Sequence, residues 1–123
     1  MARYPGLTLR ILALNAPAIG PGKAELIERI ARTGSISAAA REMGMSYRRA
    51  WMLVAALNES FVEPVVVAET GGRHGGGARV TPFGNRLVEE YHAMEDSASA
   101  AIASKVRAFE RHLRTSRTRS RRT

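Results

Sequence analysis

The stretch from Gly34 to Leu57, GSISAAAREMGMSYRRAWMLVAAL, constrains the fold of this chain more than any other. It predicts two short helices that meet at Gly44, because glycine adopts the left-handed conformation that ends a helix at no steric cost. Two helices joined by so short a turn must cross steeply, as they do in a helix-turn-helix.

Serine residues precede both predicted helices. Ser37 is expected to cap the first helix, over residues 38–43, because a serine hydroxyl accepts a backbone N–H of the first turn. Ser46 is expected to cap the second helix in the same way, from Tyr47 to about Asn58. Small and apolar side chains fall on the sides of the two helices that face each other: Ala39, Ala40, Met43, Met45, Ala50, Leu53, Val54 and Leu57. This pattern predicts a closely packed pair.

The start of the second helix leaves polar and basic side chains exposed. They are Ser46, Tyr47, Arg48 and Arg49, with Met52 one turn further on. A recognition helix presents these residue types to base edges in the major groove and to flanking phosphates. We therefore expect this surface to bind double-stranded DNA. The alternative is a helical hairpin whose arginines only solvate its surface.

Two features of this pair have two interpretations each. Ser35 and Ser37 lie at the start of the first helix, where their hydroxyls either bind DNA phosphate or serve only as caps. Trp51 falls on the exposed side when counted from Gly44, yet tryptophan is highly buried on average. The sequence alone does not decide between core and surface for this side chain.

The positive charge of the chain is concentrated at one end. The 123 residues, 45% of them hydrophobic, suit one domain, and the net charge is +8. The last thirteen residues, 111–123, hold six arginines and no acid, which leaves thirteen basic against eleven acidic residues elsewhere. We expect residues 111–123 to be a disordered basic tail. It would either add salt-sensitive affinity for DNA or be merely solvated.

Several classes of function are not expected. The chain has no cysteine, which excludes disulfides, thiolate zinc sites and cysteine nucleophiles. The three histidines, His74, His92 and His112, have no partners at a spacing typical of metal sites. We therefore expect no metal, no cofactor and no enzymatic activity. No apolar run approaches the length of a membrane span, so a cytoplasmic protein with no membrane partner is expected.

The segments on either side complete the predicted domain. A first helix from about Pro21 or Gly22 to Thr33 places Leu26, Ile27, Ile30 and Ala31 on one face. Residues 7–12 alternate as a strand does, and residues 15–22 read as a loop.

Residues 65–69 and 78–81 predict two strands around the loop TGGRHGGG. The loop lacks the Lys-Ser/Thr pair and the following helix of a phosphate-binding P-loop. After a helix-turn-helix, such a hairpin is typical of a wing, which would lay Arg73, His74 and Arg79 along the DNA backbone. The strand over residues 7–12 could pair with this hairpin.

A long helix follows the hairpin. Thr81 and Pro82 are a strong helix start, and apolar residues then recur at intervals of three and four up to Leu113. About 30 helical residues would span about 45 Å, more than a domain of this size can cover. We therefore expect a homodimer through a coiled-coil-like face, and the alternative is a frayed tail. The face consists of Met94, Ala98, Ile102, Val106 and Phe109.

The sequence resembles the N-terminal DNA-binding domain of ModE-type molybdate-responsive transcriptional regulators, a LysR-like winged helix. The matching segments are TGSIS at residues 33–37, MSYRRAW at 45–51, TGGRHGGG at 70–77 and TPFGNRLVEEY at 81–91. The resemblance implies sequence-specific DNA binding and dimerisation. Members of that family also carry C-terminal molybdate-binding domains, which are not expected within the 123 residues of this sequence. Molybdate sensing is therefore expected only through a partner sensor protein, if at all.

The predicted fold is mainly α with a small β wing. Residues 1–81 form the winged helix-turn-helix domain, residues 82–110 the long C-terminal dimerisation helix, and residues 111–123 the basic tail. The predicted function is that of a dimeric, sequence-specific transcriptional regulator. The alternatives are a protein-interaction module that docks another regulator, and a sequence-neutral nucleoid-associated DNA-binding protein.

Overall fold

The computed structural model describes residues 7–14, 16–69 and 77–114. Within these residues the chain forms four helices and two antiparallel hairpins. The elements in order are β1 (Ile11–Leu12), β2 (Pro17–Ile19), α1 (Pro21–Thr33), α2 (Ile36–Glu42), α3 (Tyr47–Ser60), β3 (Val66–Glu69), β4 (Gly77–Val80) and α4 (Pro82–Glu110). The prediction of a mainly helical fold with a small β wing is confirmed.

Helix α1 has the predicted bounds. Its first residue is proline, whose fixed φ suits that position, and it ends at Gly34, which has a φ of 72° and donates its N–H to the Ile30 carbonyl. The buried face consists of Ala24, Leu26, Ile27 and Ile30. The prediction for Ala31 was wrong because the buried stripe extends one turn toward the N-terminus, to Ala24, and Ala31 is exposed.

The N-terminal strand differs from the prediction in length and partner. It is reduced to β1, which pairs with β2 and not with the wing, and β2 lies in the segment expected to be a loop. A tight turn explains the local pairing, since the Ala13 N–H donates to the Ala16 carbonyl at 2.8 Å. The Tyr91 hydroxyl also donates to the Leu9 carbonyl at 2.7 Å and ties this segment to α4.

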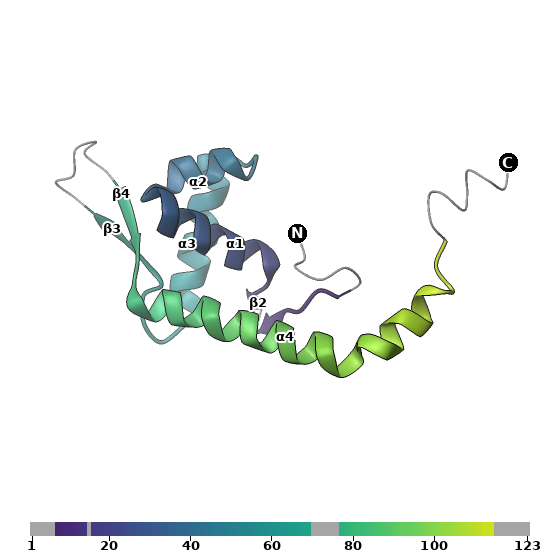
Figure 1. Cartoon of the computed structure of the whole chain (residues 1–123). Helices are drawn as coiled ribbons and strands as arrows, with labels where there is room; N and C mark the ends of the chain where they lie inside the picture. Colours follow the sequence, from purple (N-terminus) through teal and green to yellow (C-terminus); the bar gives the residue numbers. More distant parts are fainter. Residues whose placement is uncertain (1–6, 15, 70–76, 115–123) are drawn as a thin grey trace, which may run out of the picture.

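The core lies where α1, α2 and α3 meet the hairpin and the first half of α4. Its fully buried side chains include Leu26, Ile30, Leu57 and Val65, and the small Ala39, Ala40 and Ala50 let α2 and α3 approach closely. Figure 1 shows the three helices gathered on one side of α4, with the β3–β4 hairpin at the end of this body. The helix pair is thus held between α1 and the wing.

Helix α4 confirms the predicted long helix. Thr81 caps it by accepting the Gly84 N–H at 2.9 Å, and Pro82 is its first residue. Val88, Tyr91 and Glu95 are buried against the body, whereas the second half of the helix extends away from it (Figure 1). No helix among the described residues is long and apolar enough to cross a membrane.

Gly84 marks the closest approach of α4 to the hairpin. A Cβ atom at this position would lie 2.6 Å from the Val65 carbonyl oxygen and 2.8 Å from the Val80 Cγ1 atom.

We expect Gly84→Ala to lower the free energy of unfolding by about 1–3 kcal/mol, because either the helix or the strand must shift. Chemical denaturation measures this. Gly22→Ala in α1 is the matched control, since a Cβ there meets nothing within 4 Å and adds helix propensity. Equal effects of the two changes would contradict the close approach.

Candidate nucleic-acid interface

The junction between α2 and α3 is set by backbone and capping contacts. Gly44 has a φ of 70°, the conformation expected of the glycine that ends the first helix. The Met45 N–H then donates to the Ala40 carbonyl at 3.0 Å, and Ser46 caps α3 by accepting the Arg49 N–H at 3.0 Å. The predicted cap of the second helix is confirmed, and α3 runs two residues further than expected.

The first two turns of α3 present one face to solvent. Ser46, Tyr47, Arg48 and Arg49 are all exposed, while Ala50 directly behind them is fully buried. Met52 is 58% exposed and lies on the same outer side. Trp51, which the sequence left open, is 53% exposed and therefore belongs to the surface. Sequence spacing brings these side chains together on one short stretch of helix.

The cap of α2 is Ser35 and not Ser37. Ser35 has an extended backbone and its hydroxyl accepts the Ala38 N–H at 3.0 Å, so the helix begins at Ile36. Thr33 fixes this choice, because its hydroxyl oxygen accepts the Ser35 N–H at 3.3 Å. Ser37 lies in the first turn and its side chain is exposed. The two hydroxyls thus stand at the N-terminal end of α2, one as the cap and one facing solvent.

The β3–β4 hairpin forms the wing beside α3. Its strands pair in register from Val66 with Val80 to Glu69 with Gly77. The Arg79 Nε donates to the Glu69 carboxylate at 2.9 Å, and both side chains are about half exposed. Arg79 therefore lies on the outer face of the wing, next to an acid that partly offsets its charge. Arg73 and His74 lie outside the described residues.

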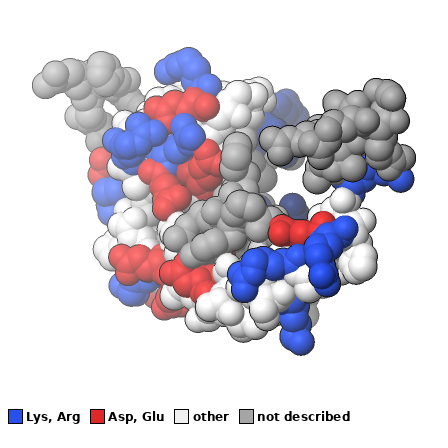
Figure 2. Space-filling model, turned by 45° about the vertical axis from the view of Figure 1, so that its right-hand side comes forward, with Lys and Arg blue, Asp and Glu red and all other residues white. Residues whose placement is uncertain are grey.

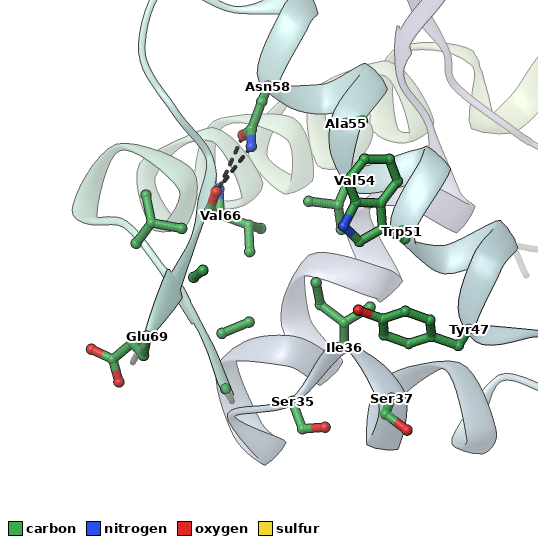
Figure 3. A pocket seen from close by; sticks show the side chains of 14 residues that line it. Ser35, Ile36, Ser37, Tyr47, Trp51, Val54, Ala55, Asn58, Val66 and Glu69 are labelled. Atoms are coloured by element: carbon green, nitrogen blue, oxygen red, sulfur yellow. Dashed lines mark hydrogen bonds between the residues drawn. The ribbon is translucent and has the colours of Figure 1, made fainter. Parts of the chain in front are cut away.

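Asn58 fixes the wing to α3, a role that the sequence alone did not indicate. Its side-chain oxygen accepts the backbone N–H groups of Val65 at 2.7 Å and Val66 at 3.2 Å, and its side-chain nitrogen donates to the Val66 carbonyl at 2.9 Å (Figure 3). Asparagine is a poor helix former, so its place near the end of α3 was the available signal. The amide sets the position of the wing relative to the exposed face of α3.

Replacing Asn58 with alanine is expected to lower the free energy of unfolding by about 2–4 kcal/mol, because buried backbone groups at Val65 and Val66 lose their partners. Thermal or chemical denaturation measures the loss, and amide hydrogen exchange should quicken at β3. The control is Ser60→Ala, which removes one exposed hydrogen bond to the Ala56 carbonyl and should change stability by less than about 0.5 kcal/mol. A neutral Asn58→Ala variant would refute this role.

A groove of about 610 Å³ opens between α3 and the wing. Figure 3 shows the rings of Tyr47 and Trp51 on the α3 side and Val66 and Glu69 on the wing side, with Ile36 at the bottom. Ser35 and Ser37 line the end formed by α2. The groove therefore joins the exposed face of α3 to the wing and combines an apolar floor with hydroxyl groups at one end.

Residues 22–85 match the family described as bacterial regulatory helix-turn-helix protein, lysR family. The chain belongs to this family. The match begins in α1, contains the helix pair and the wing, and ends in the first turn of α4.

Relatives of this lysR-family protein bear out the resemblance to ModE. The chain is 44% identical to the molybdenum-pterin-binding protein MopB of Rhodobacter capsulatus over 103 residues, which are 84% of this chain and 37% of that protein. It is 39% identical to the molybdenum transport protein ModE of Azotobacter vinelandii, over 69% of this chain and 32% of that protein. It is also 39% identical to the DNA-binding transcriptional dual regulator ModE of Escherichia coli K12, over 58% of this chain and 27% of that protein. The chain thus spans between about a quarter and somewhat more than a third of the length of these relatives.

Ion pairs join α1 to α2 on the body of this lysR-family chain. Arg29 contacts Glu25 and Glu42, and Arg32 contacts Glu42, which ties α1 to α2. The guanidinium groups of Arg32 and Arg29 hold the pKa of the Glu42 carboxyl below its usual value of 4.5. Basic and acidic side chains accordingly alternate over the face in Figure 2 and form no single-sign patch there. Affinity for a polyanion cannot come from a uniform charge on this face.

The predicted dimerisation residues lie along α4 from Met94, at the edge of the body, to Phe109 in the projecting half. Met94 is 42% exposed and Phe109 is 63% exposed, while Ala98, Ile102 and Val106 are half-buried. Near the end of the helix, Ile102, Val106 and Phe109 line an apolar hollow together with Leu113. Their spacing places them along one side of the projecting half of α4.

Proposed function

We propose that this lysR-family protein is a sequence-specific DNA-binding transcriptional regulator that acts as a homodimer. Each protomer places the start of α3 in the major groove, with the wing on the adjoining backbone. Two-fold symmetry then leads to an approximately palindromic site. The proposal includes no enzymatic activity.

The observation that carries the proposal is the exposed start of α3. Arg48 and Arg49 project from a helix turn whose geometry is fixed by the Ser46 cap and whose inner side is the buried Ala50. An arginine held in this way can donate two hydrogen bonds to guanine, while its neighbour takes a phosphate. Tyr47 and Ser46 add hydroxyl donors, and Met52 offers an apolar contact to a thymine methyl group. Basic and acidic side chains are mixed on the face shown in Figure 2, which favours recognition by this turn over attraction by a uniform charge there.

The wing and the start of α2 supply contacts to the backbone. We assign phosphate contacts to the hydroxyls of Ser35 and Ser37 and to Arg79, together with Arg73 and His74 of the wing loop. The ion pair between Arg79 and Glu69 is half exposed, so its exchange for a phosphate costs little. Contacts of this kind position the protein without reading sequence.

The names of the relatives suggest a molybdenum-related regulon. Those of the Azotobacter and Rhodobacter proteins refer to molybdenum, and that of the Escherichia coli protein refers to transcriptional regulation. We propose that the genes regulated by this chain serve molybdenum metabolism, and that any molybdate signal reaches it through a partner sensor protein.

A competition experiment separates this proposal from the sequence-neutral alternative. The full chain and a variant lacking residues 111–123 are titrated into a preferred DNA site with and without excess random duplex. If the protein is a specific regulator, deletion of residues 111–123 lowers its affinity in part, and the variant still prefers the site over random duplex. A sequence-neutral protein loses binding altogether, and a protein-interaction module binds neither DNA.

A further inference from the structure

We infer that the groove between α3 and the wing holds one sugar-phosphate strand of the DNA, with a deoxyribose packed on Trp51. This inference rests on the proposed DNA-binding function. It adds Trp51 to the residues that contact DNA and assigns the groove as the binding site of one strand. Trp51 has no place in base reading under the proposal, and the groove has no occupant within the described chain.

The position of the groove gives the first reason. If the start of α3 lies in the major groove and the wing lies on the adjoining backbone, the strand that borders this major groove must pass between the two elements. The groove of about 610 Å³ lies between these elements, because its walls are α3 on one side and β3 and β4 on the other. Asn58 keeps the two walls at a fixed separation by its hydrogen bonds to Val65 and Val66.

The chemistry of the lining gives the second reason. A sugar-phosphate strand is apolar at the deoxyribose carbons and anionic at the phosphates. The groove offers apolar side chains at Val54, Val66 and Ala78, with the Trp51 ring at its edge, and hydroxyl groups at Ser35 and Ser37. Hydroxyl donors suit phosphate oxygens, and an aromatic face suits a sugar. The lining therefore matches both parts of the strand.

The one acidic side chain among the groove residues does not oppose this assignment. The Glu69 carboxylate accepts a hydrogen bond from Arg79 at 2.9 Å, and in Figure 3 it points away from the space between Trp51 and Val66. The Glu69 side chain is about half exposed, so water screens its charge, and it lies outside the path of the strand. A phosphate at the end of the groove formed by α2 lies next to the hydroxyl groups of Ser35 and Ser37.

Trp51 is the single tryptophan of the chain, so its fluorescence reports on the groove directly. The experiment titrates the full chain with operator and random duplexes, and follows DNA binding by the anisotropy of a labelled duplex and groove occupancy by tryptophan emission. The variants are Trp51→Ala and Trp51→Phe. Leu12→Ala is the matched control, because it removes a large exposed apolar side chain of β1, which belongs to neither α3 nor the wing and does not line the groove.

The inference predicts that emission and anisotropy change over the same range of DNA concentration. Trp51→Ala should weaken binding on the order of tenfold for both duplexes, since a sugar contact carries no sequence information, whereas Trp51→Phe and Leu12→Ala stay within about threefold.

Binding without an emission change and with a neutral Trp51→Ala variant would overturn the inference and leave the proposed function standing. A fall in the operator-to-random ratio would overturn it as well, because Trp51 would then read a base. A concentration-dependent emission change without DNA would assign the groove to a second copy. Absence of DNA binding by anisotropy would overturn the proposed function itself.

Discussion

Replacing Arg48 and Arg49 together with alanine is expected to lower the affinity for the preferred DNA site by about 100- to 1000-fold. One bidentate contact to guanine contributes about 1–3 kcal/mol of discrimination, and loss of a phosphate contact adds to this. Affinity for random duplex should fall much less, so the preference for the site collapses. Electrophoretic mobility shift or anisotropy titrations of both duplexes measure the two affinities.

The control for this variant removes the same amount of charge elsewhere. Arg10 and Arg86 are exposed and lie on neither α2, α3 nor the wing. Their double replacement with alanine should leave the site preference unchanged and weaken both affinities slightly, through the net charge. Equal losses in the two double variants would mean that binding follows charge alone, as a sequence-neutral protein requires.

Ile102→Asp is expected to convert the protein to a monomer and to weaken operator binding by about 100-fold or more. Ile102 lies near the centre of the apolar face from Met94 to Phe109, and a carboxylate buried between two helices costs several kcal/mol. When two linked protomers bind two half-sites, the affinity is about 10²–10⁴ times higher than for one protomer on one half-site. The monomer lacks this gain in affinity. Sedimentation velocity and DNA titration measure the two effects.

Ser104→Asp is the matched control because it adds the same charge two residues away, on the exposed opposite side of α4. It should leave both the dimer and the DNA affinity unchanged. Circular dichroism confirms that both variants keep the helix. A wild-type protein that is monomeric at tens of micromolar would contradict the dimer directly.

The sequence predicted those features of the fold that depend on neighbouring residues. Gly34 and Gly44 end their helices in the left-handed conformation, and Ser46 and Thr81 cap α3 and α4, because each signal acts within one helical turn. The cap of α2 was misplaced by two residues. Ser35 and Ser37 are two serines close together at the start of this helix, and the hydrogen bond from the Ser35 N–H to the Thr33 hydroxyl favours Ser35.

Features that depend on contacts between elements were not predictable in the same way. Asn58 acts on backbone groups seven and eight residues away, across the turn that separates α3 from β3. Residues 17–19 looked like a loop because their strand is short and follows a tight turn. The helical count from Gly44 placed Trp51 on the exposed side of α3, whereas the usual burial of tryptophan favoured the core, and its exposure in the structure agrees with the count. The groove arises only when α3 and the wing are placed together.

The central claim is that this chain recognises a particular DNA sequence as a dimer. The most direct test is capture and sequencing of genomic fragments by the purified protein at about physiological salt, with and without molybdate. We expect a recurring inverted repeat, enriched equally in both conditions, beside genes of molybdenum metabolism. Uniform recovery of all fragments would contradict sequence-specific recognition.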